Sequence, residues 1–434
     1  DVVQLFDPVC KMSKQIVSGN LVPSLVREAF RISEEERPGA VLLELPEDVA
    51  AEETDAQLIP PHTRFYAIGC DEVLFKAAEK IRLAKKPLIL LGAGANRRNI
   101  RKSITEFIKF TKIPFFVTQM GKGVVDESLP LFLGTAALSD KDYLHDYIKA
   151  ADLIINIGHD VVEKPPFFME HGGSEVIHIN FKSAKVDQIY FPQIEVVGHI
   201  MLSLERLIQI IETPSQYDLT DFEKVRDNVL SAINEKADSD DFPLKPQRVV
   251  SEIRKLMGYH DIIALDNGVY KIWFARNYPA YQPNSILLDN ALATMGAGLP
   301  SAMMAAMLFE KRKVVAICGD GGFMMNSQEI ETAVRLSLNL VVIVLNDSSY
   351  GMIRWKQSGA GFADWGLEYK NPDFIAYAKS YGAHGHRISS AENLYETLQT
   401  AFNAGGVHLI DVPVDYSENV KYLITDLAEH KSII

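Results

Sequence analysis

Two aspartates at the ends of apolar runs are the residues of this sequence most suited to chemistry. One run, Lys313–Cys318, is followed by Gly-Asp-Gly-Gly, and a second run, Leu340–Leu345, is followed by Asn-Asp. The two acidic residues are Asp320 and Asp347. Carboxylate oxygens are ligands that Mg2+ prefers, and the ion commonly takes one or two of them together with phosphate oxygens and water. Brought together, these side chains would form the protein part of a magnesium site.

The segment between the two runs predicts that the aspartates meet. Its apolar residues recur at the spacing of a helix packed on a sheet: Ile330, Ala333, Val334 and Leu338. Asn326 and Glu329 fit a capping box at the start of that helix. A strand, a helix and a second strand form a βαβ unit, whose right-handed crossover brings the carboxyl ends of both strands to one sheet edge. We therefore expect Asp320 and Asp347 to lie together there.

Two glycines after Asp320 predict what else this edge binds. Gly321 and Gly322 have no side chains, so a phosphate group can approach the backbone and meet N–H groups at the start of the helix. Asp-Gly is also a common hairpin turn, but a hairpin needs a strand directly after the turn, and a helix is predicted here. The pattern favours a site for a metal ion and a diphosphate.

At this point the sequence resembles a known family. Gly319-Asp320-Gly321 with Asn346-Asp347 is similar to the metal–diphosphate motif of thiamine-diphosphate enzymes. Within that family, the segment from Asn326 to Gln357 most resembles acetolactate synthase of the catabolic, flavin-independent type. The resemblance implies thiamine diphosphate and Mg2+ as cofactors and pyruvate as substrate, two molecules of which condense to 2-acetolactate with loss of CO2. Another thiamine-diphosphate carboligase, a 2-keto-acid decarboxylase or a non-catalytic cofactor-binding fragment remain alternatives.

The same resemblance implies which residues form the site. Asp320, Asp347 and the backbone carbonyl of Ser349 are the expected metal ligands, and Met295 is expected under the folded cofactor. Without the resemblance, Met295 would be assigned to the hydrophobic core. The complete set of expected cofactor-binding residues is Gly268, Val269, Tyr270, Thr294, Met295, Gly319, Asp320, Gly321, Gly322, Asp347, Ser349, Tyr350, Gly351, Met352 and Ile353. The catalytic residue is unknown, because the family's activating glutamate is expected upstream of Asp1.

Two further groups of residues allow more than one interpretation. Arg354, Trp355 and Lys356 either meet an acidic substrate or form a solvated loop. Asn371 and Pro372 have the pattern of a helix cap followed by a first-turn proline. The eleven histidines show no HExxH spacing, and His384-Gly385-His386 is expected at a strand edge rather than in a zinc site.

Composition excludes several classes of protein. The chain has 434 residues, of which 47% are hydrophobic and 23% charged, as in ordinary globular proteins. A formal net charge of −13 argues against a nucleic-acid or anionic-membrane partner. The three cysteines, Cys10, Cys70 and Cys318, form no CxxC pair, which favours a cytoplasmic location. No apolar run approaches the roughly 18 residues of a membrane span.

Alternating strand and helix patterns predict an α/β fold of doubly wound, mostly parallel sheets with flanking helices. The resemblance identifies this as the thiamine-diphosphate-binding fold, and it implies that residues 1–55, with a helix at Leu21–Arg31 and a strand at Ala40–Leu45, are the C-terminal part of a pyrimidine-binding domain. A Rossmann-like domain at 67–211, a solvated connector with one helix at 212–245, and the diphosphate-binding domain at 246–434 follow. In the family, domains of two subunits share each site, so we expect a homodimer or homotetramer and an inactive or nearly inactive isolated chain.

The central domain carries an incomplete dinucleotide pattern. Gly92-Ala93-Gly94 follows a predicted strand, but the third glycine of GxGxxG is replaced by Arg97, and Gln119 ends the next strand where an acid is needed. Gly158–Pro165 resembles the flavin-free pattern of the catabolic enzymes. We therefore expect no FAD and assign the domain the role of a spacer.

Overall fold

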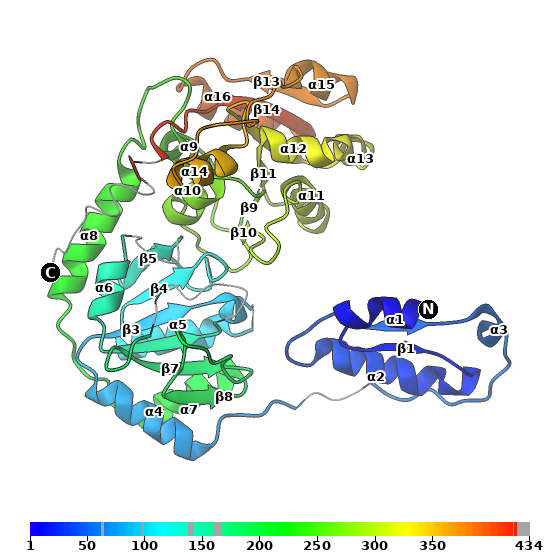
Figure 1. The fold of residues 1–434 in the computed structure, drawn as a ribbon, viewed down its shortest axis with the longest axis vertical. Helices are drawn as coiled ribbons and strands as arrows, with labels where there is room; N and C mark the ends of the chain where they lie inside the picture. The colour runs from blue at the N-terminus through cyan, green and yellow to red at the C-terminus, as the bar shows by residue number, and fades with distance from the viewer. Residues whose placement is uncertain are drawn as a thin grey trace. The chain divides into compact units, whose positions relative to one another are not determined.

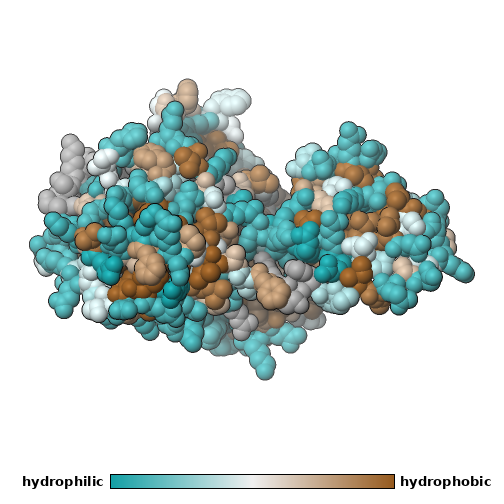
Figure 2. Space-filling model, turned by 90° about the horizontal axis from the view of Figure 1, so that it is seen from below, coloured by the Kyte–Doolittle hydropathy of each residue, from teal (hydrophilic) through white to brown (hydrophobic). Residues whose placement is uncertain are grey.

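The computed structural model describes residues 1–61, 65–97, 99–137, 143–159, 167, 169–419 and 421–422. They form two compact units, which are treated one at a time: residues 1–68 with Val197–His199, and the remainder of the chain. No helix among the described residues is both long and apolar enough to cross a membrane. On the face seen in Figure 2, hydrophilic residues predominate and hydrophobic ones are scattered among them.

The first unit contains a two-stranded parallel sheet, in which β1 pairs with β2. Its elements are α1 (Val2–Phe6), η1 (Asp7–Val9), β1 (Ser13–Gln15), η2 (Gly19–Leu21), α2 (Val22–Glu34), β2 (Leu42–Glu44) and α3 (Glu47–Ala50). The predicted helix and strand are thus confirmed within a few residues. The role of this stretch in a larger domain stays a prediction.

A six-stranded sheet in the order β5-β4-β3-β6-β7-β8 forms the centre of residues 69–211 (Figure 1). Its strands are β3 (Pro87–Leu91), β4 (Phe115–Thr118), β5 (Phe132–Ala136), β6 (Leu153–Ile157), β7 (Glu175–Asn180) and β8 (Ile194–Val197). The associated helices are α4 (Asp71–Leu83), η3 (Ala93–Ala95), α5 (Arg101–Thr111), α6 (His145–Ala150), α7 (Ile200–Ile211) and α8 (Thr220–Asn234). Alternate residues of the buried strands face two separate hydrophobic clusters, so helices cover both sides of the sheet.

Helix α8 lies in the stretch that we predicted to be a solvated connector. The helix itself is confirmed, but Phe222, Val225 and Val229 are buried in one of the two clusters on the central sheet. The expectation of a solvated connector is therefore wrong for this helix. Its apolar positions recur at intervals of three and four residues, which gives it one buried face within an acidic sequence.

The second six-stranded sheet has the order β10-β9-β11-β12-β14-β13, and all its described pairs are parallel. Its strands are β9 (Ile262–Leu265), β10 (Ile286–Leu287), β11 (Val314–Gly319), β12 (Leu340–Asn346), β13 (His384–Arg387) and β14 (Val407–Pro413). Helices α9 (Pro246–Leu256), α10 (Tyr270–Asn277) and α16 (Asn393–Ala404) cover one face. Helices α11 (Gly298–Leu308), α12 (Asp320–Asn326), α13 (Ile330–Arg335) and α15 (Phe374–Ser380) cover the other. The predicted doubly wound α/β class is confirmed.

The βαβ unit forms as predicted, but its helix does not begin where we expected. Helix α12 starts at Asp320, directly after β11, and a short turn, η4 (Ser327–Glu329), separates it from α13. The Asn326 side chain makes no capping hydrogen bond, so the capping box is wrong. Its Nδ2 instead donates to the carbonyl of Gly296 at 2.7 Å, a partner 30 positions away in the sequence.

Candidate functional site

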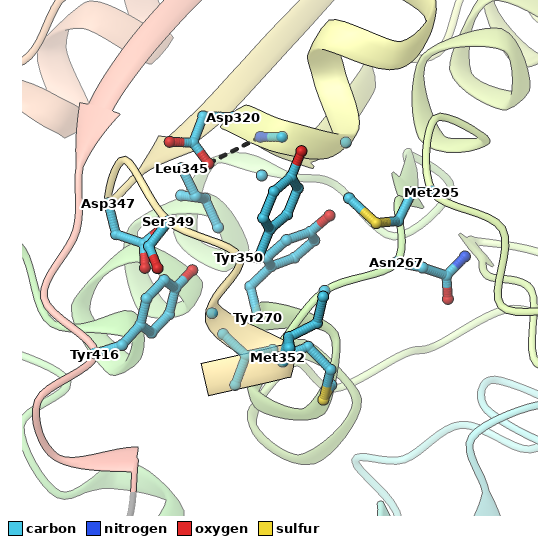
Figure 3. A pocket seen from close by; sticks show the side chains of 17 residues that line it. Asn267, Tyr270, Met295, Asp320, Leu345, Asp347, Ser349, Tyr350, Met352 and Tyr416 are labelled. Atoms are coloured by element: carbon cyan, nitrogen blue, oxygen red, sulfur yellow. Dashed lines mark hydrogen bonds between the residues drawn. The ribbon is translucent and has the colours of Figure 1, made fainter. Parts of the chain in front are cut away.

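The carboxyl ends of β9, β11 and β12 open onto one cavity, whose empty space is about 440 Å3 when the solvent at its mouth is included (Figure 3). Neighbouring strands place Gly319 opposite Leu345, and Asp320 and Asp347 follow these two positions. The cavity is lined by every expected cofactor-binding residue except Thr294, and in addition by Asn267, Leu345 and Tyr416. The structure therefore brings the predicted residues together, while their roles toward a cofactor stay predictions.

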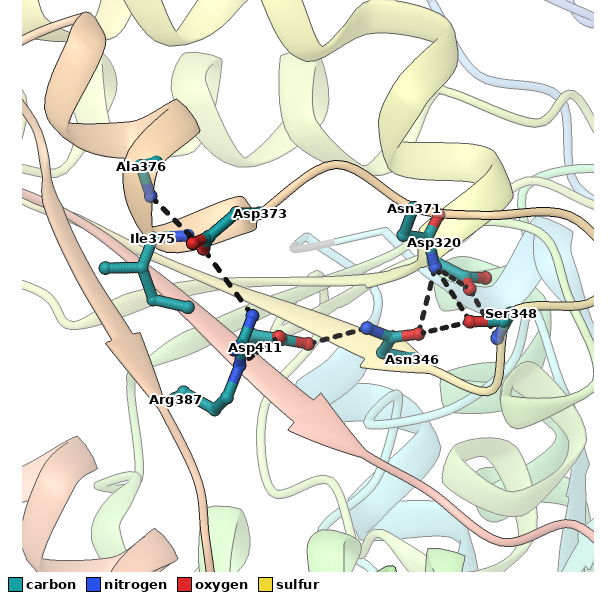
Figure 4. A network of polar contacts seen from close by, with 9 residues as sticks. All are labelled: Asp320, Asn346, Ser348, Asn371, Asp373, Ile375, Ala376, Arg387 and Asp411. Carbon is teal, nitrogen blue, oxygen red and sulfur yellow. Dashed lines mark hydrogen bonds and ion pairs between the residues drawn. The ribbon is translucent and has the colours of Figure 1, made fainter.

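Asp320 is the most heavily hydrogen-bonded residue of the site, and its side chain is buried (Figure 4). Its Oδ1 accepts from the backbone N–H of Gly321 at 2.9 Å and from the Tyr369 hydroxyl at 2.8 Å. Its Oδ2 accepts from the backbone N–H of Ser348 at 2.8 Å and from Asn371 Nδ2 at 2.7 Å. These four donors compensate for the loss of water around a buried charge.

Asp347 lies beside this carboxylate, and its surroundings disfavour its ionised form. Burial, and then the charge of Asp320, raise the pKa of the Asp347 carboxyl to about 7, while Arg354 acts in the opposite direction. Two neighbouring carboxylates in a half-buried place repel each other, and a divalent cation between them would relieve that repulsion. Among the described residues, no three His, Cys, Asp or Glu side chains are placed to hold a metal ion. The predicted site therefore rests on two carboxylates and the Ser349 carbonyl.

The two glycines after Asp320 serve different purposes. A Cβ added to Gly322 would lie 2.1 Å from Oδ2 of Asp266, so this glycine is required for contact with the end of β9. A Cβ on Gly321 would lie 2.8 Å from the Tyr369 hydroxyl and 3.0 Å from the Tyr350 ring. Asp266, which is distant in sequence, thus occupies the space that a Cβ of residue 322 would need, while both glycines line the cavity. The expectation that a phosphate approaches the backbone at these two positions stays a prediction.

Asp266 organises the loop that carries Met295. Its side chain is fully buried, and Oδ1 accepts from the backbone N–H groups of Asn267 and Gly296, both at 2.8 Å, and of Ala297 at 3.1 Å. Asn267 Nδ2 in turn donates to the carbonyl of Thr294 at 2.8 Å. Thr294, which we expected to contact the cofactor, does not line the cavity, and its carbonyl accepts a hydrogen bond that helps to fix the loop.

The remaining wall of the cavity combines an apolar surface with polar atoms that have no partner. Met295, Leu345, Met352 and Ile353 provide the apolar surface. The buried oxygen atoms Tyr270 Oη, Ser349 Oγ and Tyr416 Oη make no hydrogen bond. Figure 3 shows the Tyr416 side chain pointing toward Asp347 and Ser349. Apolar surface, unpaired polar atoms and paired carboxylates fit a ligand that has an aromatic ring and a metal-bound diphosphate.

Arg354, Trp355 and Lys356, which the sequence left open, lie on α14 (Gly351–Gly359) and do not line this cavity. Arg354 forms ion pairs with Asp364 and Glu368, both at 3.0 Å. Its charge is thus already compensated by two acidic residues, which disfavours the role in holding an acidic substrate.

Sequence reasoning missed three residues of the site: Tyr369, Asn371 and Tyr416. Asn371 was interpreted as a helix cap, but Asp373 caps α15 by accepting from the N–H groups of Ile375 and Ala376. The Asn-Pro pattern predicts a helix start, and nothing in it indicates that the side-chain amide of Asn371 reaches Asp320. The prediction for His384 and His386 is confirmed, since both lie on β13 at the edge of the sheet.

The glycines of the incomplete dinucleotide pattern have a packing role. A Cβ on Gly92 or Gly94 would lie 2.8 or 2.9 Å from the carbonyl oxygen of Gly158, so the loops after β3 and β6 need both glycines to pack together. In the stretch Gly158–Pro165, positions 160–165 lie outside the described residues. The expectation that no FAD is bound stays a prediction.

Comparison with known proteins identifies two matching families. Residues 74–207 match the family described as thiamine pyrophosphate enzyme, central domain, and residues 266–412 match the C-terminal TPP binding domain of such enzymes. An acetolactate synthase from Bacillus subtilis is 30% identical over 97% of this chain and 75% of its own length. A catabolic acetolactate synthase from Raoultella terrigena is 31% identical over 96% of this chain and 76% of its own length. A putative thiamine pyrophosphate-containing protein from B. subtilis, YdaP, is 28% identical over 95% of this chain and 71% of its own length.

The raised pKa of Asp347 predicts that divalent cations bind more tightly as the pH rises through 7. A cation binds the ionised carboxylate and a proton competes for it, so with a pKa of about 7 the affinity should be about tenfold higher at pH 8 than at pH 6. Isothermal titration calorimetry with Mg2+ at both pH values, in two buffers of different ionisation enthalpy, measures the affinity and the protons released. Asp347→Asn should abolish the dependence, and equal affinities for the native chain at both pH values would contradict the prediction.

The hydrogen bonds of Asp266 predict a loss of stability on its removal. In Asp266→Ala the N–H groups of Gly296 and Ala297 lose their acceptor, which should lower the free energy of unfolding by about 3 kcal/mol. Urea denaturation followed by circular dichroism measures the change. Asp227→Ala, at an exposed position of α8, serves as the control and should change the free energy of unfolding by less than about 0.5 kcal/mol. Equal effects of the two substitutions would show that Asp266 does not hold the loop.

Proposed function

Because the chain belongs to the acetolactate synthase family of thiamine pyrophosphate enzymes, we propose that it condenses two molecules of pyruvate to 2-acetolactate, with release of CO2, using thiamine diphosphate and Mg2+. The observation that carries the proposal is the cavity in which Asp320, Asp347 and Ser349 lie beside an apolar wall. A site of this composition can hold a metal-bound diphosphate at one end and a heterocyclic ring at the other.

In the proposed complex, the chain supplies the metal ligands from the ends of β11 and β12. The carboxylates of Asp320 and Asp347 and the carbonyl of Ser349 would bind Mg2+, which leaves the other coordination positions to diphosphate oxygens and water. The donors around Asp320 fix the orientation of its carboxylate before any ligand arrives. Such preorganisation lowers the entropy that binding costs and keeps the diphosphate in one position.

The apolar wall is the part of the site that would surround the reacting carbon of the substrate. When bound, thiamine diphosphate supplies the nucleophilic carbon and the electron sink of the decarboxylation. Met295, Met352 and Ile353 would exclude water around the reacting carbon, and a surrounding of low polarity favours the loss of a charged carboxylate as neutral CO2. The backbone held by Asp266 and Asn267 fixes the position from which Met295 would contact the ring.

Further features of the proposal concern the whole protein. We propose a cytoplasmic homodimer or homotetramer that acts on pyruvate without FAD. Support comes from the resemblance to the flavin-independent type and from the low cysteine content. The activating glutamate is not assigned to any residue of the printed sequence.

Product analysis tests the proposed reaction. The protein is supplied with pyruvate, thiamine diphosphate and Mg2+, and the expected product is 2-acetolactate, detected by mass spectrometry and as acetoin after acid treatment. Acetaldehyde as the main product would identify a 2-keto-acid decarboxylase, and tartronate semialdehyde from added glyoxylate would identify a different carboligase. A protein with no activity toward either acid would support the non-catalytic alternative.

A further inference from the structure

The hydrogen-bonding capacity of the Asp320 carboxylate is fully used by the chain itself. An ionised carboxylate has about four lone-pair positions. The donors are the N–H of Gly321 and the hydroxyl of Tyr369 on Oδ1, and the N–H of Ser348 and the amide of Asn371 on Oδ2. A cation needs a lone pair of its own, so at least one donor must leave Asp320 before this carboxylate can bind a metal.

Tyr369 also contacts the second predicted ligand. Its hydroxyl lies 3.3 Å from the backbone carbonyl oxygen of Ser349, in addition to the 2.8 Å contact with Asp320. The same oxygen would lie only 2.8 Å from a Cβ added to Gly321, the residue at which a phosphate was expected to approach. A single phenol oxygen therefore lies among two predicted metal ligands and the predicted phosphate position.

The other three donors are poorly placed to leave. The N–H groups of Gly321 and Ser348 belong to the backbone, in the first turn of α12 and in the loop directly after β12, so neither can leave Asp320 unless that backbone moves. Asn371 Nδ2 has further acceptors in Asn346 Oδ1 at 2.9 Å and Ser348 Oγ at 3.4 Å, so these contacts hold it in place. Of the four donors, Tyr369 is thus the one whose departure disturbs the fewest other contacts.

The segment that carries Tyr369, residues 360–370, has features of a movable strap. Gly361 and Gly366 have positive φ values of 76° and 67°, and an added Cβ would meet no atom within 4 Å at either position. Phe362 and Trp365 are 69% and 85% exposed, so these two large side chains add little packing, and the middle of the strap is held chiefly by the ion pairs of Asp364 and Glu368 with Arg354 at the surface. Low contact density and exposed backbone are properties of segments that open at small cost.

The strap is nevertheless held in its present position by specific contacts. Tyr350 donates its N–H to the carbonyl of Leu367 at 3.1 Å, and Tyr369 donates its N–H to the carbonyl of Ser348 at 3.2 Å. The rings of Tyr350 and Tyr369 pack with centroids 4.9 Å apart. These contacts keep the Tyr369 hydroxyl aimed at Asp320.

We propose that the Tyr369 hydroxyl and a divalent cation compete for Asp320 and Ser349, so that binding of the cation releases Tyr369 and moves the strap. The inference rests on the proposed function, because it takes Asp320 and Ser349 as metal ligands. It makes Tyr369 a residue that sets the affinity and selectivity of the site: a cation binds only when its interaction with the two oxygen ligands exceeds that of the hydroxyl. A diphosphate that arrives with its cation would bind more readily than the free metal, because its own contacts with the chain add to the interaction that displaces the hydroxyl.

Removal of the hydroxyl tests the competition directly. Tyr369→Phe keeps the ring packed against Tyr350 and should bind Mn2+ about tenfold more tightly than the native chain, because the cation no longer displaces a hydrogen bond to a charged group. The free Mn2+ signal in electron paramagnetic resonance measures the affinity, without a need for activity. Tyr377→Phe loses a hydroxyl contact to Ser327 at 2.8 Å, away from the predicted ligands, and should bind Mn2+ like the native chain.

Unchanged or weaker Mn2+ binding by Tyr369→Phe would overturn the inference, because it would show that the hydroxyl does not compete with the metal. A third variant separates the inference from the proposed function. Asp320→Ala is titrated in parallel. If it binds Mn2+ as the native chain does, the proposed metal site is wrong; if it loses binding while Tyr369→Phe gains none, only the competition is wrong.

Movement of the strap gives a readout that does not depend on the stability of the Tyr369 variant. Trp365 lies within the strap, so saturation of the native chain with Mn2+ should change its fluorescence. The difference between the native chain and Trp365→Phe isolates that signal from the other two tryptophans. A Trp365 signal that stays constant through saturation would contradict the release of the strap.

Discussion

The burial of the Asp320 carboxylate at the end of β11 is the constraint on which the site depends. A charge in this position is tolerated only with a full set of hydrogen-bond donors or with a cation. The donors come from the start of α12, the loop after β12 and the strap before α15. Asp347, immediately after β12, brings a second carboxylate close by, and the resulting repulsion gives the pair an affinity for a divalent cation.

The parts of the fold that sequence reasoning predicted well are those set by local pattern and chain connectivity. Strand–helix alternation gave the doubly wound sheets, and the rule of right-handed crossovers brought Asp320 and Asp347 to one edge. Motif resemblance then supplied the residues after β9 and β12 that line the cavity. None of these inferences depends on how the side chains pack in the interior.

The failures at individual polar residues have one physical cause: polar side chains pair with groups that are close in space, which need not be close in sequence. Asn326 and Asn371 both fit helix-cap patterns, yet Asn326 binds the carbonyl of Gly296 and Asn371 binds Asp320. The contact between Gly322 and the Asp266 side chain was likewise not predicted. A local pattern cannot predict such contacts, because each one joins positions that are separated by tens of residues. A capping hydrogen bond has a similar free energy, so the pattern alone does not decide which of the two forms.

The account is tested most directly by calorimetric titration of the chain with thiamine diphosphate, with and without Mg2+, alongside Asp320→Ala, Asp347→Ala and the exposed control Asp227→Ala. We predict binding that requires Mg2+, that is lost in the first two variants and that is unaffected in the control. Binding that proceeds without metal, or that is indifferent to both aspartates, would contradict the assignment of this sheet edge as the metal–diphosphate site.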